Sequence, residues 1–413
     1  MTATDPRRTL ETVWRMESAR IVAALARLVH DLGLAEELAQ DTLVIALEQW
    51  PIGGVPDHPA SWLMATAKHR AVDALRRQGR YREKLQLLGH QTPDAEDPDI
   101  AAAMDDYVGD DLLRLVFATC HPVLSTESRV ALTLRLLGGL TTEEIARAYL
   151  VSESTVGQRI TRAKRTLADN RVPIELPPPA EAGQRLASVL EVIYLIFNEG
   201  YSATAGDDWM RPALCEEALR LGRILATLAP DEPEVLGLVA LMELQASRTA
   251  ARTAPDGTAI LLQDQDRRRW DRLLIRRGLA ALAKTEGSYG PYVLQASIAA
   301  CHARAAHSDD TDWRRIAALY EVLRHVSPSP VVDLNRAVAV SMAEGPAAAL
   351  RIVDELVAAD ALPGSHLLPG VRGELLTRLG RTAQARAELA RAIELCGNDR
   401  ERRVLERKRD ALG

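Results

Sequence analysis

The sequence is poor in aromatic residues and in cysteine. Aromatics make up only 4% of its 413 residues, including two Phe, so the cores must be built from Leu, Ala, Val and Ile. Such a composition favours helix over sheet. The four cysteines, Cys120, Cys215, Cys301 and Cys396, lie far apart with no CxxC pair. This spacing excludes a sequence-local zinc site and a dense disulfide framework, and we expect buried free thiols.

Long apolar runs are also missing. No run approaches the roughly 20 residues that span a bilayer, and the first residues, MTATDPRRTLETVW, contain no apolar signal core. We therefore expect a cytoplasmic protein with no membrane contact. The sequence has no His/Asp/Ser constellation, glycine-rich phosphate loop or metal-ligand spacing. We accordingly expect no enzymatic activity, no catalytic residue, no cofactor and no metal.

The length of the chain suggests two or three domains. A proline-rich segment and an acidic segment mark divisions between them. The run VPIELPPP at 172–179 cannot continue a helix, because proline lacks the backbone N–H, and it marks the main boundary. Residues 91–111 contain no Lys or Arg and form an acidic connector. Its acids are Asp94, Glu96, Asp97, Asp99, Asp105, Asp106, Asp110 and Asp111.

The net charge of −6, taken as a total, argues against a nucleic-acid partner, but a total hides how the charges are distributed. Residues 1–170 contain 20 Lys+Arg against 24 Asp+Glu. The eight acids of the connector more than account for that excess. The segments on either side of the connector are therefore modestly basic, and the acidic total does not exclude DNA.

The sharpest local pattern lies at 140–167. Thr141 and Glu144, three residues apart, form a capping box that begins one helix, and Ser152 caps a second. Two short helices in this order are the helix-turn-helix pattern. One outward face of the second helix carries Gln158, Arg159, Arg162 and Arg165. Arg and Gln on such a face can read base edges in a major groove.

A basic run, 68–84, ends the third of three helices expected between residues 9 and 85. Taken alone, this run is as well explained by a solvated helix face, and an isolated helix-turn-helix match is also weak. The two patterns gain weight because they occur in order and are separated by an acidic connector.

These residues resemble the extracytoplasmic-function group of bacterial RNA polymerase sigma factors. Region 2 of that group is matched by LAEELAQDTL at 34–43, ASWL at 60–63 and AKHRAVDALRR at 67–77, and region 4 by 140–167. Four further segments are similar to a subgroup with a long C-terminal extension ending in tetratricopeptide-like repeats. They are CHP at 120–122, LIFNEGY at 195–201, DQDRRRWD at 264–271 and PSPVVDLNRA at 328–337.

The resemblance implies an all-α fold and a promoter-directing subunit of RNA polymerase. The implied domains are region 2 (1–90), an acidic linker (91–111), region 4 (112–172), a helical extension (180–310) and tetratricopeptide-like repeats (311–413). The implied partners are core RNA polymerase and promoter DNA. The linker would thread a positively charged polymerase channel, whereas without the resemblance it reads equally well as a solvated tether.

Site residues follow from the same resemblance. Polymerase would be bound by Glu36, Glu37, Gln40 and Asp41. The −10 element would be contacted by Lys68, Arg70, Arg76 and Arg77. The −35 element would be contacted by Thr155, Gln158, Arg159, Arg162 and Lys164. Trp62 is better explained as a core residue than as a stacking platform. Leu150 stands where a turn glycine is usual and Gly157 where a basic residue is common, so no −35 sequence is predicted.

The C-terminal half is predicted to be helical throughout. Helix starts near 313, 346 and 382 are spaced by 33 and 36 residues, close to the tetratricopeptide period. The stacked pairs either pack on the protein's own sigma domains or bind a regulatory protein, and both readings stay open. We expect the charge-dense segment 264–271 to form a salt-bridge network or to contact region 2 or 4, Gly200 to cap a helix, and Asp207 and Asp208 to be solvated.

One alternative function remains. The chain would be a helix-turn-helix transcriptional activator with a tetratricopeptide-like regulatory domain that never acts as a sigma subunit. The match to region 2 opposes this reading, because an activator needs no second DNA-engaging module.

Overall fold

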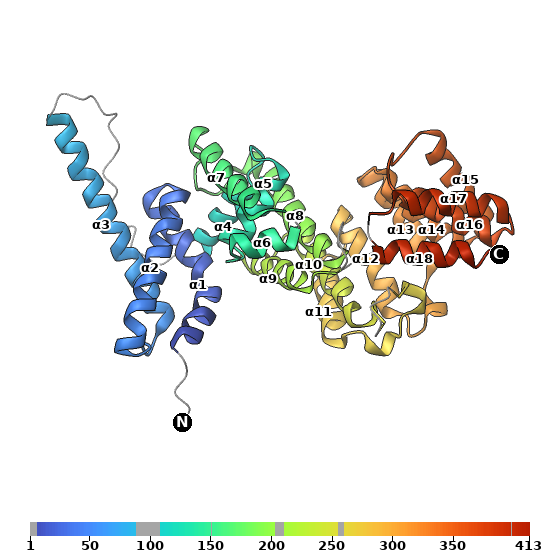
Figure 1. The fold of residues 1–413 in the computed structure, drawn as a ribbon, viewed down its shortest axis with the longest axis horizontal. Coiled ribbons are helices and arrows are strands. Elements are labelled where there is room, and N and C mark those ends of the chain that lie inside the picture. Colours follow the sequence, from blue (N-terminus) through green and yellow to red (C-terminus); the bar gives the residue numbers. More distant parts are fainter. Residues whose placement is uncertain (1–5, 88–107, 150, 203–209, 255–259, 398) are drawn as a thin grey trace. The chain divides into compact units, whose positions relative to one another are not determined.

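The computed structural model is built from α-helices and short 3-10 helices (Figure 1). It describes residues 6–87, 108–149, 151–202, 210–254, 260–397 and 399–413, and these contain no strand. The expected all-α fold is therefore confirmed. Helix packing divides the chain into two compact units, residues 1–193 and 194–413, and the division falls inside one long helix.

Eight helices begin among the described residues of the first unit. They are α1 (Pro6–Val29), α2 (Leu32–Gly53), α3 (Pro59–Leu87), α4 (Val108–Thr119), α5 (Thr126–Leu136), α6 (Thr142–Tyr149), α7 (Glu153–Asp169) and α8 (Pro179–Tyr201).

Helices α1, α2 and α3 pack around one apolar core. Leu25, Trp50 and Leu63, one from each helix, are at most 2% exposed. Burial of each such side chain contributes about 2 kcal/mol. Trp62 is half-buried, and its ring meets that of Trp50 edge to face at 5.7 Å between centroids. Its expected place in the core is thus largely confirmed. Asp31 caps α2 by accepting a hydrogen bond from the Leu34 N–H.

The acidic linker is helical at its end. Helix α4 begins at Val108, so Asp110 and Asp111 belong to it rather than to a tether. Asp111 is 3% exposed and accepts hydrogen bonds from Arg27 of α1 at 2.9 Å and from Arg114 at 3.2 Å. It is therefore a buried structural anion. The other acids of the linker, from Asp94 to Asp106, lie outside the described residues.

The capping box of α6 is confirmed. The Thr141 N–H donates to Glu144 at 2.8 Å, and the Glu144 N–H donates to the Thr141 hydroxyl at 3.1 Å. Ser152 caps α7 by accepting from the Thr155 N–H. Val156 and Ile160 of α7 are buried, as a helix-turn-helix requires. Leu150, the residue in the turn, lies outside the described residues.

The second unit continues the helical array. Its further helices are α9 (Pro212–Leu228), α10 (Pro233–Ala246), α11 (Arg272–Ala283), α12 (Pro291–Arg304), α13 (Trp313–Val326), α14 (Pro330–Ala343), α15 (Pro346–Ala358), α16 (Leu367–Arg378), α17 (Thr382–Leu395) and α18 (Asp399–Asp410). The predicted helix starts at Trp313, Pro346 and Thr382 are confirmed. Each of the last six described helices packs against the next one along the chain, at the C-terminal end of the second unit (Figure 1).

Among the described residues, the charge-dense segment 264–271 contains one ion pair, between Arg268 and Asp266 at 2.9 Å, rather than the expected network. Arg267 is 7% exposed and donates to the backbone carbonyls of His302 and Ala305 at the end of α12. Asp266 caps the 3-10 turn Arg267–Arg269, and Asp271 caps α11. The segment therefore ties α11 to α12 mainly by capping backbone groups that would otherwise be unpaired.

Gly200 is not a helix cap either. It lies inside the last turn of α8, and a Cβ there would sit 2.6 Å from the backbone nitrogen of Cys215. The glycine is needed because α8 and α9 approach this closely. All four cysteines are buried and none forms a disulfide, as expected. Asp207 and Asp208 lie outside the described residues. None of the described helices is long and apolar enough to cross a membrane.

Candidate nucleic-acid interface

Helix α7 presents a polar face beside the buried one. Gln158 and Arg162, four residues apart, are exposed, whereas Thr155 and Arg159 are half-buried. The hydroxyl of Thr155 lies 2.7 Å from that of Ser152 at the helix start. A Cβ on Gly157 would meet nothing within 4 Å, so the backbone there faces open space. Helix α7 thus exposes side-chain hydrogen-bond donors, and its backbone at Gly157 can be approached closely. Both features suit a helix that enters a major groove.

Helix α3 carries the cations predicted to contact the −10 element. Arg76 and Arg77 are exposed, and Arg77 donates to the backbone carbonyl of Asp73. Lys68 and Arg70 are half-buried. Arg70 binds Asp41 of α2 at 2.8 Å, so a predicted DNA contact is paired with a predicted polymerase contact.

Glu36 of α2 is the most deeply buried of the predicted site residues. It is 8% exposed, accepts a hydrogen bond from Arg135 of α5 at 2.6 Å and forms an ion pair with Lys164 of α7. Arg135 also donates to the carbonyl of Leu140. Both cationic partners of Glu36 therefore come from the second half of the first unit, which contains the helix-turn-helix.

Burial and charge act in opposite directions on this carboxylate. Desolvation raises the pKa of Glu36, but the hydrogen bonds and charges of Lys164 and Arg135 outweigh it, and the pKa lies below its ordinary value. Glu36 is thus ionised at neutral pH. A buried carboxylate with two cationic partners is costly to unpair.

The predicted sites therefore meet each other. Glu36 was predicted to contact polymerase and Lys164 to contact the −35 element, yet the two side chains form an ion pair with each other. Glu37, Gln40 and Asp41 of α2 stay partly or fully exposed. Sequence reasoning missed Arg135, because no local pattern marks a residue that pairs with a partner 99 positions away.

Helix α8 forms hydrogen bonds with α4, with the residue just after α4 and with α5, which precede the helix-turn-helix. Arg185 donates to the carbonyl of Phe117, and Ser188 donates to the carbonyl of Cys120. Arg129 of α5 binds the Ser188 hydroxyl at 2.5 Å and Glu191 at 3.0 Å. The first helix after the proline run is therefore bonded to the region that precedes it.

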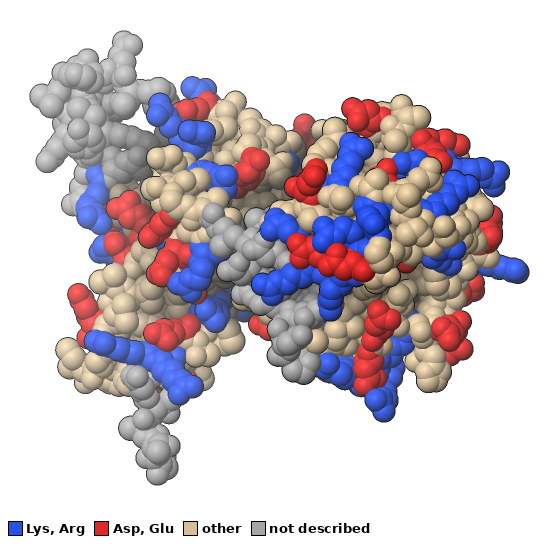
Figure 2. Space-filling model, turned by 45° about the vertical axis from the view of Figure 1, so that its right-hand side comes forward, with Lys and Arg blue, Asp and Glu red and all other residues tan. Residues whose placement is uncertain are grey.

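Charge is dispersed over the face of the molecule shown in Figure 2. Lys and Arg side chains lie among Asp and Glu side chains there, with no single large field of one sign. A face of this kind supplies little long-range attraction for a polyanion.

Comparison with known families assigns these helices. Residues 14–81, covering most of α1 to α3, match sigma-70 region 2. Residues 114–167, covering most of α4 to α7, match sigma-70 region 4. In the curated proteins, an extracytoplasmic-function (ECF) RNA polymerase sigma factor of Mycobacterium tuberculosis (strain ATCC 25618 / H37Rv), SigL, is 31% identical over 144 residues. That match covers 34% of this chain and 76% of SigL.

The chain belongs to the extracytoplasmic-function sigma factors.

Two further relatives show the extent of the likeness. A probable ECF RNA polymerase sigma factor of the same strain, SigI, is 26% identical over 183 residues, 43% of this chain and 60% of SigI. An uncharacterized protein of Rhizobium meliloti (strain 1021), R00370, is 44% identical over 396 residues, 95% of this chain and 93% of the relative. This sigma factor therefore shares its long extension with a relative of nearly the same length.

The extension has no assigned role in these comparisons. Residues 185–286 match a family of unknown function, DUF6596. No solved structure matches the chain. What the extension does must therefore be argued from its own residues.

Proposed function

We propose that this sigma factor directs core RNA polymerase to promoters through −10 and −35 contacts, helps to open them, and is regulated by its C-terminal extension. The observation that carries the first part is the presence of regions 2 and 4, in order, on helices that leave DNA-facing donors exposed. The proposed polymerase contacts are Glu37, Gln40 and Asp41, joined by Glu36 once it is uncovered. The proposed DNA contacts are Lys68, Arg70, Arg76 and Arg77 at −10, and Thr155, Gln158, Arg159, Arg162 and Lys164 at −35.

Geometry requires the two regions to separate on a promoter. Elements centred near −10 and −35 lie about 25 base pairs apart, roughly 80 Å along a duplex. In the structure, Glu36 of region 2 pairs directly with Lys164 of region 4. The proposal is that this closed arrangement is the resting form, and that polymerase exchanges it for contacts of its own. The 20 residues between Leu87 and Val108 reach at most roughly 70 Å when extended, enough for a large separation.

Transcription by purified components tests the sigma role. Fragmented genomic DNA is transcribed by sigma-free core polymerase with and without the chain, and the RNA 5′ ends are sequenced. We expect defined start sites that depend on the chain and share upstream elements. If starts appear only when the housekeeping sigma factor is also added, the chain is a helix-turn-helix activator, and the sigma proposal is wrong.

Helix α7 provides a matched pair of variants for the same assay. Arg162→Ala removes an exposed cation from the proposed −35 face, and we expect roughly 10-fold less transcript, because one base contact is worth about 1–3 kcal/mol. Arg147→Ala removes an exposed cation of α6 whose partner is Glu143 four residues away. Equal transcription by the two variants would remove Arg162 from the −35 contacts.

Regulation by the extension is supported by the bonds of α8 to α4 and α5, which connect the extension to region 4. Two truncations test it, one after Tyr201, which keeps α8, and one after Thr311, which removes only α13 to α18. More transcript than from the full chain means that the removed part inhibits; loss of transcript from soluble, helical protein means that it is required. Unchanged transcription by both truncations would contradict regulation by the extension.

A further inference from the structure

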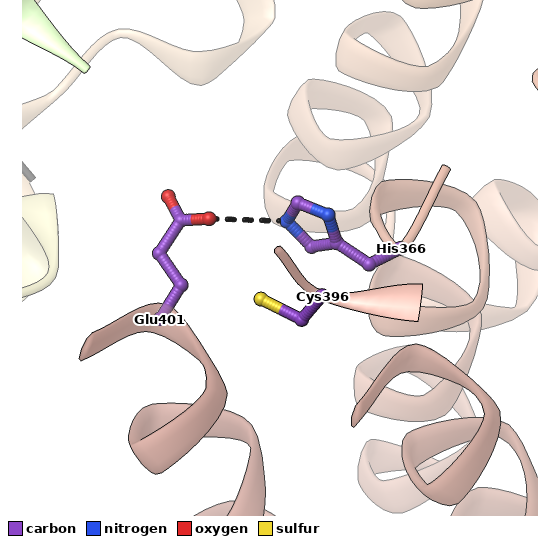
Figure 3. A group of neighbouring side chains, drawn as sticks. All are labelled: His366, Cys396 and Glu401. Atoms are coloured by element: carbon purple, nitrogen blue, oxygen red, sulfur yellow. Dashed lines mark ion pairs between the residues drawn. The ribbon is translucent and has the colours of Figure 1, made fainter. Parts of the chain in front are cut away.

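Three metal-ligating side chains meet near the C-terminal end of the second unit. His366 precedes α16, Cys396 follows α17, and Glu401 lies in the first turn of α18 (Figure 3). One ligand atom from each lies within 4.8 Å of the other two. The Nε2 atom of His366 is 3.2 Å from a carboxylate oxygen of Glu401. In Figure 3 the sulfur of Cys396 points toward the space beside this pair.

The chemistry of this set selects a class of cation. Calcium and magnesium prefer oxygen ligands alone, so a thiolate and an imidazole in one site exclude them. Sulfur, nitrogen and oxygen ligands together suit zinc. A thiolate and a carboxylate also neutralise a charge of +2. We propose that His366, Cys396 and Glu401 bind one Zn²⁺ ion, with water in the fourth position.

The geometry needs only a small adjustment. Bond lengths of about 2.0 to 2.3 Å to a tetrahedral zinc place the ligand atoms roughly 3.3 to 3.6 Å from one another. The His366–Glu401 pair already meets that spacing. The sulfur of Cys396 lies within 4.8 Å of the other two ligand atoms, so it must approach them by about 1 Å at most. On binding, the thiol gives its proton to solvent and the sulfur bonds to the metal as thiolate, and the proton between His366 Nε2 and Glu401 is also released so that Nε2 can bind.

The backbone around the three ligands is already held in place. Arg402 of α18 donates to the carbonyl of Cys396 at 2.6 Å, which fixes the turn between α17 and α18. Lys408, farther along α18, binds Glu374 of α16 at 2.7 Å. The side chains of His366 and Glu401 are 24% and 33% exposed, so water and ions can reach them. The zinc ion would join α18 to the ends of α16 and α17.

Cobalt is a direct probe of this site, because Co²⁺ bound by a thiolate has a charge-transfer band and tetrahedral Co²⁺ has visible bands. The full-length protein is freed of metal with a chelator and titrated with Co²⁺ and then with Zn²⁺. We expect one equivalent of Co²⁺ to develop the thiolate band and one of Zn²⁺ to abolish it. Zinc should also raise the thermal midpoint of the C-terminal unit by several degrees.

Variants separate this site from chance binding. Cys396→Ser should abolish the thiolate band and weaken zinc binding at least 10-fold, whereas Cys301→Ser, which alters another buried thiol, should leave both unchanged. Glu401→Gln, a substitution at a partly exposed position, tests the site even if Cys396→Ser unfolds. It should keep the thiolate band but require at least 10-fold more metal.

Absence of a thiolate band in the full-length protein would overturn the proposal. So would a band of full intensity in Cys396→Ser, which would place the metal at another thiol. The readout is metal binding rather than transcription, so its failure would leave the sigma role untouched.

Discussion

Glu36 is the residue on which the closed form of the first unit depends. It is 8% exposed, and both of its cationic partners come from the helix-turn-helix half of the unit. Replacing the carboxylate by an amide keeps the shape of the side chain and leaves Lys164 and Arg135 without a counter-charge. The effect of such a change reports the electrostatic contribution of this contact.

We predict that Glu36→Gln lowers the free energy of unfolding of the first unit by about 1–3 kcal/mol at neutral pH. Urea denaturation followed by circular dichroism measures this change. The control is Glu37→Gln, an exposed neighbour on the same helix, whose effect should stay within about 0.5 kcal/mol. Equal effects of the two substitutions would contradict the conclusion that the buried ion pairs of Glu36 stabilise the first unit.

Acid should act on the same contact. Because the folded-state pKa of Glu36 lies below its ordinary value of 4.5, the stability that it contributes is present above pH 4.5. That contribution is lost as the pH falls below 4.5 and through the folded pKa. In Glu36→Gln this part of the acid dependence should be missing, which unfolding curves between pH 3 and pH 6 would show.

His302 in the second unit should also make the protein less stable as the pH falls. Burial, assisted by the charges of Arg248 and Arg267, lowers its pKa to about 4. Because the unfolded value is about 6.5, protonation favours the unfolded chain, and stability falls as the pH drops from 6.5 to 4. The loss is about 3 kcal/mol at most. His302→Phe, which keeps a ring against Trp313, should flatten this dependence in unfolding curves, whereas replacing the exposed His325 should not.

At the scale of elements, the two halves of helix α8 pack against different helices. Its first half bonds to α4 and α5, and its last turn contacts α9 at Gly200. The two glycines of the helix have different surroundings. A Cβ on Gly183 would meet nothing within 4 Å, whereas a Cβ on Gly200 would overlap the backbone of Cys215.

We predict that Gly200→Ala destabilises the protein by about 1–3 kcal/mol, because backbone atoms of α9 cannot move aside cheaply. Gly183→Ala should be neutral or stabilising by up to about 1 kcal/mol, because alanine is the better helix former. Thermal unfolding of the two variants gives the comparison. A stable Gly200→Ala protein would mean that α8 and α9 are farther apart than in the structure.

At the scale of the whole molecule, the proposed sigma activity requires the closed first unit to open. The four native cysteines are buried, so new cysteines at exposed positions can be labelled selectively with fluorescent dyes. Glu48 of α2 and Arg165 of α7 are suitable positions, because both are exposed. Neither is among the proposed polymerase, −10 or −35 contacts, and the measurement contains no DNA, so the place of Arg165 on the outward face of α7 does not affect it.

We predict high energy transfer between dyes at Glu48→Cys and Arg165→Cys in the free protein, and a marked fall when core polymerase is added. Adding Glu36→Gln to the labelled chain should lower the transfer before polymerase is present. Transfer that stays constant on addition of polymerase would show that regions 2 and 4 function without separating.

Features that depend on neighbours in sequence were predictable. The capping box of Thr141 and Glu144, the exposed face of α7 and the helix starts at Trp313, Pro346 and Thr382 all follow from spacings of three or four residues or from proline. Such patterns determine where a helix begins and which of its faces is apolar. They do not determine what that face meets.

The sequence by itself therefore determined the helical class and most of the helix starts, because these rest on local hydrogen bonding and periodicity, and its resemblance to a known family gave the order of regions 2 and 4. Only the tertiary structure decided that Glu36 pairs with Lys164, 128 residues away, and that Arg267 caps backbone carbonyls instead of joining an ion-pair network. It also brought His366, Cys396 and Glu401 together from three elements. The physical reason is the same throughout: a buried charge or a metal ligand is defined by partners that packing supplies, and no spacing along the chain encodes them.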